Sequence, residues 1–148
     1  MSSNTERTLK LLKSRGMKAG IVERYVAQVW VKNGQRGIRK DLFGIIDIIA
    51  LDFNRGVVGV QSAGQDFSGH DRKILTEKRQ EAVDWLSTPG TSLELIAWRK
   101  IKKERGKSTE IWAPRVKVYA LADFEEFDPL ALRETGFFER DWDEAEEE

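Results

Sequence analysis

Apolar residues are densest between residues 42 and 63, where two runs flank a short polar segment. The runs LFGIIDIIAL (42–51) and VVGVQSA (57–63) are rich in β-branched residues, and DFNRG between them has the composition of a turn. The pattern predicts a β-hairpin. Because apolar residues occupy both faces of each run, both strands are predicted to lie in the interior of a sheet.

The rest of the chain predicts helices and strands around this hairpin. Leucine spacing after Asn4, a candidate N-cap, and before Gly16 predicts a helix over residues 5–15. Residues 17–29 fit both a strand and a helix, and a strand is favoured for the first half. The segment 32–40, KNGQRGIRK, is predicted to be a loop because it is rich in glycine and bases.

Beyond the hairpin, apolar residues recur at helical spacing over 70–87, and the next two apolar runs predict strands over 92–100 and 112–121. The order of elements predicts an α/β fold with a mixed sheet.

Length and composition restrict the class of protein. A chain of 148 residues is expected to form one domain, and it has no apolar stretch long enough to cross a membrane. The N-terminus lacks the pattern of a secretory signal, so the cytoplasm is the expected compartment. With no cysteine and one histidine, the chain cannot form a thiolate or histidine-rich metal site. Any metal would be held by oxygen atoms.

Charge is distributed unevenly between the two ends of the chain. Residues 122–148 contain twelve acids and two bases, whereas residues 1–121 carry a net charge of +10. We therefore expect a folded domain over 1–121 and an acidic, flexible C-terminal extension over 122–148. The basic domain predicts a polyanionic partner, DNA first. The bases expected to contact phosphate are Arg39, Lys40, Arg99, Lys100, Lys102, Lys103, Arg105 and Lys107.

One charged residue, Asp47, interrupts the first strand of the hairpin. If residues 52–56 form the turn, antiparallel pairing places Asp47 opposite Gln61 on one side of the sheet. A buried carboxylate requires a partner, which is either a divalent cation or a set of structural hydrogen bonds. Asp41, six residues earlier in an extended strand, would lie about 20 Å from Asp47, too far to share a metal. Membership of Glu23 in the site stays open.

These residues resemble a known family. A carboxylate on one strand of a hairpin, a position matching Glu-x-Lys on the next and a helix afterwards resemble the PD-(D/E)XK nuclease superfamily, and ERTLKLLKSRG (6–16) resembles the first helix of archaeal-type Holliday junction resolvases. The resemblance implies a restriction-endonuclease-like mixed sheet flanked by helices. It also implies a homodimeric DNA endonuclease that uses Mg²⁺ or Mn²⁺ on branched DNA, with Glu6 and Asp47 as metal ligands.

The chain departs from that motif at two chemically important positions. Gln61 stands where the family has an acid and Ala63 where it has a lysine. Gln61 would then complete the metal shell through its carbonyl oxygen, and Lys73 is the candidate for a migrated catalytic lysine, ahead of His70. Two alternatives remain: a DNA-binding or scaffold module of the same fold without catalysis, and an interaction protein that acts through its acidic tail.

Overall fold

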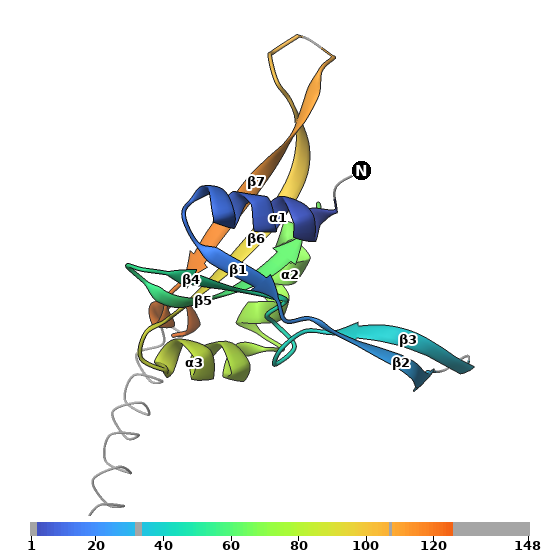
Figure 1. The fold of residues 1–148 in the computed structure, drawn as a ribbon, viewed down its shortest axis with the longest axis vertical. Helices are drawn as coiled ribbons and strands as arrows, with labels where there is room; N and C mark the ends of the chain where they lie inside the picture. The colour runs from blue at the N-terminus through green and yellow to red at the C-terminus, as the bar shows by residue number, and fades with distance from the viewer. Residues whose placement is uncertain (1–2, 32–33, 107, 126–148) are drawn as a thin grey trace, which may run out of the picture.

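A five-stranded mixed sheet forms the centre of the molecule (Figure 1). The computed structural model describes residues 3–31, 34–106 and 108–125. The strands lie in the order β1-β4-β5-β6-β7; β5 and β6 are parallel, and the other neighbours are antiparallel. Their bounds are β1 (Lys18–Ile21), β4 (Ile48–Asp52), β5 (Gly56–Ala63), β6 (Thr91–Lys102) and β7 (Glu110–Tyr119). The predicted mixed α/β sheet is confirmed.

Helices cover both faces of this sheet. Helix α1 (Asn4–Ser14) packs Leu12 against one face, together with Ile96 of β6. Helices α2 (Phe67–Leu75) and α3 (Arg79–Ser87) pack on the other face, where Leu93 and Leu95 of β6 are buried. Successive side chains of a strand point to opposite faces, so the continuous apolar run of β6 supplies two separate cores.

Two of the helix predictions require correction. The N-cap of α1 is Ser3, whose side chain accepts a hydrogen bond from Glu6 N, rather than Asn4. The single helix expected over 70–87 is two helices, and the first begins at Phe67 after the N-cap Asp66. The break falls at residues 76–78. There the Thr76 hydroxyl donates a hydrogen bond to the Arg72 carbonyl oxygen, and this bond competes with continuation of the helix.

The segment expected to be a loop contains a strand. β2 (Arg24–Val31) and β3 (Gly34–Lys40) pair as a separate two-stranded sheet that projects from the body (Figure 1). Over residues 34–40 the loop prediction is wrong, because glycine and basic residues disfavour a strand only locally; residues 32 and 33 lie outside the described ranges. Antiparallel pairing with β2, including Tyr25 opposite Arg39, supplies the hydrogen bonds that stabilise β3.

The described chain ends in a 3₁₀ helix, η1 (Leu121–Phe124). Phe124 is buried against Tyr119, with ring centroids 6.0 Å apart, so the packed body includes this residue. Most of the predicted acidic extension, from residue 126 onward, and the predicted phosphate ligand Lys107 lie outside the described residues. Within the described ranges, no helix has the length and apolar character needed to cross a membrane.

We predict that the hydroxyl of Thr8 fixes α1 on the sheet. It accepts a hydrogen bond from the buried Trp98 indole N–H at 2.8 Å and lies 2.7 Å from Ser62 Oγ. Thr8→Val should lower the free energy of unfolding by about 1–3 kcal/mol, because the indole N–H is left buried without an acceptor. Urea denaturation measures this loss. Thr8→Ser keeps the hydroxyl and is the control; an equal loss in both variants would contradict the prediction, because only Thr8→Val removes the acceptor of the indole N–H.

Candidate metal site

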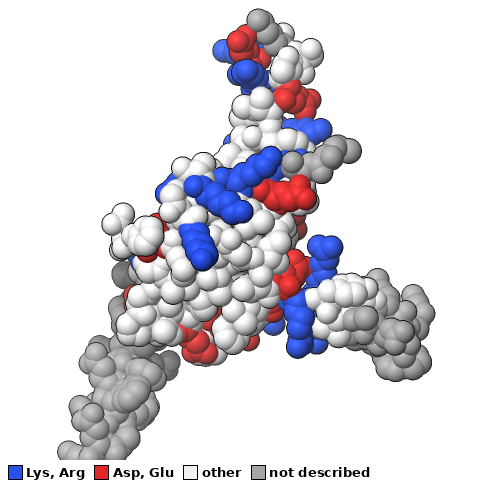
Figure 2. Space-filling model, in the orientation of Figure 1, with Lys and Arg blue, Asp and Glu red and all other residues white. Residues whose placement is uncertain are grey.

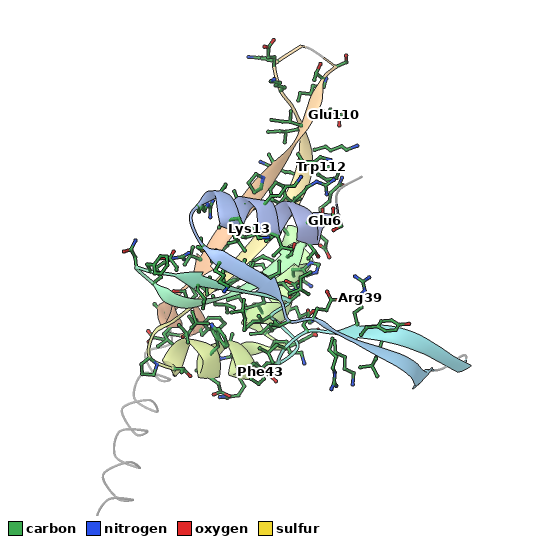
Figure 3. The ribbon with its side chains drawn as sticks, viewed as in Figure 1. Glu6, Lys13, Arg39, Phe43, Glu110 and Trp112 are labelled. Carbon is green, nitrogen blue, oxygen red and sulfur yellow. The ribbon has the colours of Figure 1, made fainter. Side chains whose placement is uncertain are left out.

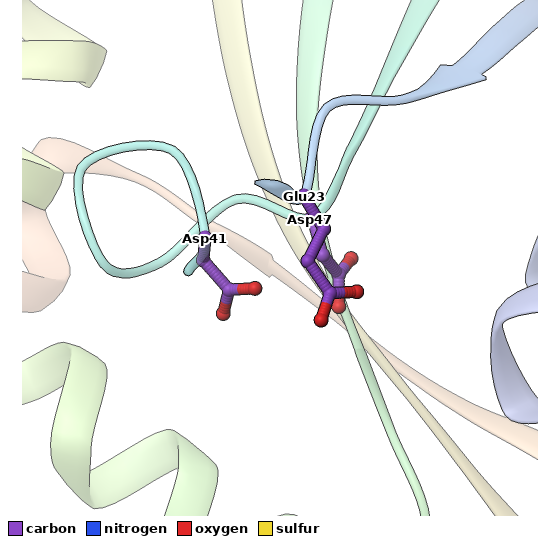
Figure 4. Close-up of side chains that lie close together, drawn as sticks. All are labelled: Glu23, Asp41 and Asp47. Carbon is purple, nitrogen blue, oxygen red and sulfur yellow. The ribbon is translucent and has the colours of Figure 1, made fainter. Parts of the chain in front are cut away.

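Three carboxylates meet at the start of β4. Oxygen atoms of Glu23, Asp41 and Asp47 all lie within 4.8 Å of one another, and the three side chains point toward a common position (Figure 4). We call these residues the carboxylate group. They come from three segments: the connection from β1 to β2, the residue directly after β3 and the residue before β4.

The placement of Asp41 overturns the expectation that it lies about 20 Å from Asp47. The chain between them is a turn, in which Leu42 N donates to Ile46 O at 2.7 Å and Ile46 N donates back to Leu42 O at 3.0 Å. Phe43 and Gly44 have φ values of 55° and 77°, which reverse the chain direction. The expectation assumed an extended strand through these residues. The Phe-Gly pair was the available signal for a turn.

Glu23 is held beside Asp47 by the backbone. The amides of Val22 and Glu23 both donate to the carbonyl oxygen of Asp47, at 2.9 and 3.3 Å. Arg39 approaches the outer side of this carboxylate, with Nε 4.0 Å from Glu23 Oε1. The sequence left Glu23 open because no local pattern shows that β1 ends against the residue preceding β4.

Asp47 is the buried member of the group, with 5% of its surface exposed. Ser62 N donates to both of its carboxylate oxygens, at 3.0 and 3.1 Å. Burial raises the pKa of the Asp47 carboxyl to about 8, and the charges of Asp41 and Glu23 contribute to the rise, while the Ser62 N–H opposes it. The cost of ionising this side chain is therefore high without a nearby cation.

Gln61 lies where the hairpin register predicted. The pairs Ile49 with Gly59 and Leu51 with Val57 are confirmed, and the Gln61 side chain reaches Asp47. Its amide nitrogen donates to Asp41 Oδ2 at 3.2 Å and to Asp47 Oδ2 at 3.3 Å. The nitrogen rather than the predicted carbonyl oxygen therefore faces the carboxylates. It links the two acids without adding charge.

Glu6, the other predicted ligand, belongs to the first turn of α1. Its side chain accepts a hydrogen bond from Ser3 N at 3.3 Å and closes a capping box. Among the described residues it is not one of the acids gathered around Asp47. Glu6 and Glu23 do line the same pocket, of about 380 Å³, between α1 and the β2–β3 ribbon.

The predicted lysine, Lys73, and Ala63, which stands where the nucleases that the sequence resembles have a lysine, lie in different surroundings. Lys73 lies in the last turn of α2, and its ammonium makes no hydrogen bond or ion pair to the carboxylate group in the described structure. Ala63 is buried in the apolar core with Ile74. The sequence reasoning missed Lys78: a Cβ at Gly44 would lie 3.0 Å from its Nζ, so Lys78 packs over the turn that carries Asp41.

The predicted phosphate ligands fall into two exposed groups. Arg39 and Lys40 end β3, close to the carboxylate group, and Arg39 projects from the ribbon in Figure 3. The second group follows the outer half of β6 and its connection to β7. Its exposed described members are Arg99, Lys100, Lys102, Lys103 and Arg105.

Comparison with protein-family models, curated proteins and solved structures gives no match to this chain. The chemistry of the site therefore rests on its own residues. Three carboxylates offer hard oxygen ligands of the kind that Mg²⁺ and Mn²⁺ prefer, and a cation between them would offset their mutual repulsion. The residues present fit a divalent cation.

We predict that Asp47 destabilises the metal-free protein as pH rises. Its carboxyl titrates near 3.8 in the unfolded chain and at about 8 in the folded one, so the folded state retains the proton longer. The protonated Asp47 carboxyl contributes fully to the stability of the folded state below about pH 4, and this contribution is lost as pH rises to about 8. Between pH 5 and pH 8, the free energy of unfolding of Asp47→Asn should therefore rise relative to that of wild type by on the order of 1–3 kcal/mol.

Urea denaturation in EDTA at several pH values measures this difference. Asp84→Asn, an exposed substitution on α3, is the matched control. A difference between Asp47→Asn and wild type that does not change with pH would contradict the prediction.

Proposed function

We propose that this protein is a divalent-metal-dependent DNA endonuclease in which Glu23, Asp41 and Asp47 hold Mg²⁺ or Mn²⁺. The observation that carries the proposal is the convergence of three carboxylates on one position, with Asp47 buried. The sheet with helices on both faces agrees with the restriction-endonuclease-like fold that the sequence resemblance implies. Homodimer formation and a preference for branched DNA are further parts of this proposal.

The chain's own residues give each carboxylate a distinct task. The Ser62 N–H and the Gln61 amide fix the orientation of Asp47, and Asp41 shares the Gln61 amide. Glu23 lies on the side facing the pocket, where substrate can approach. A bound divalent cation would supply charge neutralisation at phosphate and an activated water. Lys73 and Lys78 are the ammonium groups to test for stabilising the developing phosphate charge.

An unpaired basic surface supports DNA as the substrate. Arg7 of α1 stacks 3.8 Å from the ring centre of Trp112, and Lys100 lies 5.2 Å from the same ring. Neither cation has a carboxylate partner among the described residues, and Figure 2 shows Lys and Arg gathered over α1. On the opposite face Lys117 is paired with Asp71 at 2.8 Å. Two neighbouring cations without counter-ions favour binding of phosphate.

The second candidate is a DNA-binding module that does not cut. It is favoured by the neutral Gln61 bridge and by Ala63, which is packed in the core where the related nucleases carry a lysine. Both candidates require the basic surface, and only the first requires the carboxylate group to bind metal.

We predict that Mn²⁺ stabilises the wild-type protein and supports DNA cleavage. At a metal concentration one hundred times Kd, the free energy of unfolding should rise by about 2.7 kcal/mol. Asp47→Asn and Asp41→Asn should lose both the stabilisation and the cleavage, while Asp84→Asn keeps both. Thermal unfolding with Mn²⁺ or EDTA, and cleavage of linear and four-way DNA, provide the measurements. Cleavage that survives in EDTA or in Asp47→Asn would refute the metal site.

We predict that Arg7 and Lys100 each contact a phosphate of DNA. Arg7→Gln and Lys100→Gln should weaken binding and reduce the slope of log K against log salt by about one each. Fluorescence anisotropy with a labelled duplex, measured between 50 and 200 mM salt as typical conditions, gives both quantities. Lys18→Gln, on the edge strand at the other side of the sheet, is the charge-matched control. Equal slopes in all three variants would exclude this surface as the site of phosphate contact.

A further inference from the structure

A pocket adjoins the carboxylate group on the side of the β2–β3 ribbon. It has a volume of about 380 Å³ and lies between the start of α1, the end of β1 and the base of the ribbon. Glu23 belongs both to the pocket and to the carboxylate group. Glu6 and Arg39, labelled in Figure 3, line the pocket from the helix and from the ribbon. A molecule in this pocket would therefore touch the candidate metal site.

Tyr25 presents an aromatic ring to this pocket. The residue is 65% exposed, so a ligand in the pocket can reach its ring. The ring lies across the backbone of Gly37 in β3, where a Cβ atom on residue 37 would overlap the phenol. The strand thus supports the ring, and the absence of a side chain at Gly37 makes that close contact possible. A supported, exposed ring is a platform for stacking.

Arg39 provides a cation beside the same ring. It pairs directly with Tyr25 across the ribbon, so both side chains lie on one face of it. Its side chain is 75% exposed, and its nearest carboxylate oxygen, on Glu23, is 4.0 Å away. Most of the guanidinium's donors are therefore available to a phosphate that lies between the ring and the carboxylate group.

We propose that this pocket binds one unpaired nucleotide of DNA next to the phosphate to be cleaved, with its base stacked on Tyr25 and a phosphate held by Arg39. The inference rests on the proposed DNA substrate and adds its class: DNA that carries a single-stranded or unpaired nucleotide. A base within a duplex is already stacked on its neighbours and cannot place its face on a ring inside a pocket. An unpaired base can, and base–aromatic stacking tolerates any sequence.

Two substitutions test the platform in different ways. Tyr25→Ala removes the ring, and Gly37→Ala displaces it with one methyl group and no change of charge. Both should weaken binding of a labelled 12-nucleotide single strand by about tenfold or more, while affinity for a blunt duplex stays within about twofold. The matched controls should bind as wild type: Tyr25→Phe keeps the ring, and Gly20→Ala adds a methyl group where no atom lies within 4 Å.

Binding is measured in EDTA by fluorescence anisotropy, so the result does not depend on catalysis. Thermal unfolding verifies that each variant is folded, and the pair Tyr25→Ala and Tyr25→Phe decides the outcome if Gly37→Ala does not fold. Single-strand affinity that is unchanged in Tyr25→Ala would overturn the inference, as would equal losses for single strand and duplex. Absence of any DNA binding by wild type would overturn it together with the proposed substrate.

Cleavage distinguishes failure of this inference from failure of the proposed function. If wild type binds the single strand in the predicted pattern but never cuts with Mn²⁺, the pocket stands and the endonuclease proposal fails. If wild type cuts, and Tyr25→Ala cuts single-stranded and branched DNA as well as wild type does, the endonuclease proposal stands and the proposed nucleotide pocket is overturned.

Discussion

The buried residue Asp47 organises the site through its backbone as well as its side chain. Its amide donates to Val60 O at 3.0 Å, and its carbonyl receives the amides of Val22 and Glu23, so one residue joins the end of β1 to β5 at the start of β4. Its carboxylate receives the Ser62 N–H. These bonds fix where the chain leaves β1, and therefore where Glu23 lies and where the β2–β3 ribbon begins. The carboxylate group and the pocket beside it both depend on this junction.

The same junction extends to helix α1. Ser62 donates its amide to Asp47 and places its hydroxyl 2.7 Å from Thr8 Oγ1, which in turn accepts the indole N–H of Trp98. A hydrogen-bonded chain thus runs from the buried carboxylate through β5 to the first turns of α1. Because α1 also carries Arg7, and Glu6 at the pocket, the basic surface and the candidate metal site are parts of one packed unit.

Local patterns allowed prediction where the structure follows local rules. The hairpin register followed from the length of its turn, and with it the contact between Asp47 and Gln61. The prediction failed where a long-range contact or an unusual backbone conformation decides the structure. β3 is a strand because β2 pairs with it, and Asp41 reaches the site because Phe43 adopts a positive φ that its residue type disfavours. Such features carry no hydrophobic period from which to infer them.

A second buried acid in the same sheet has a counter-ion from within the chain. Glu94 of β6 is 2% exposed, and Arg55 donates to it at 2.8 Å, so a guanidinium within the chain balances its charge. Asp47 has comparable burial, yet no Lys or Arg of the described chain forms an ion pair with it. Two further carboxylates and a neutral amide surround it instead. An arrangement selected for stability alone would favour an internal counter-ion, because gathering acids raises the cost of ionisation. The difference between Glu94 and Asp47 therefore supports the proposal that the carboxylate group holds a cation, because only a cation from outside the chain could balance an ionised Asp47.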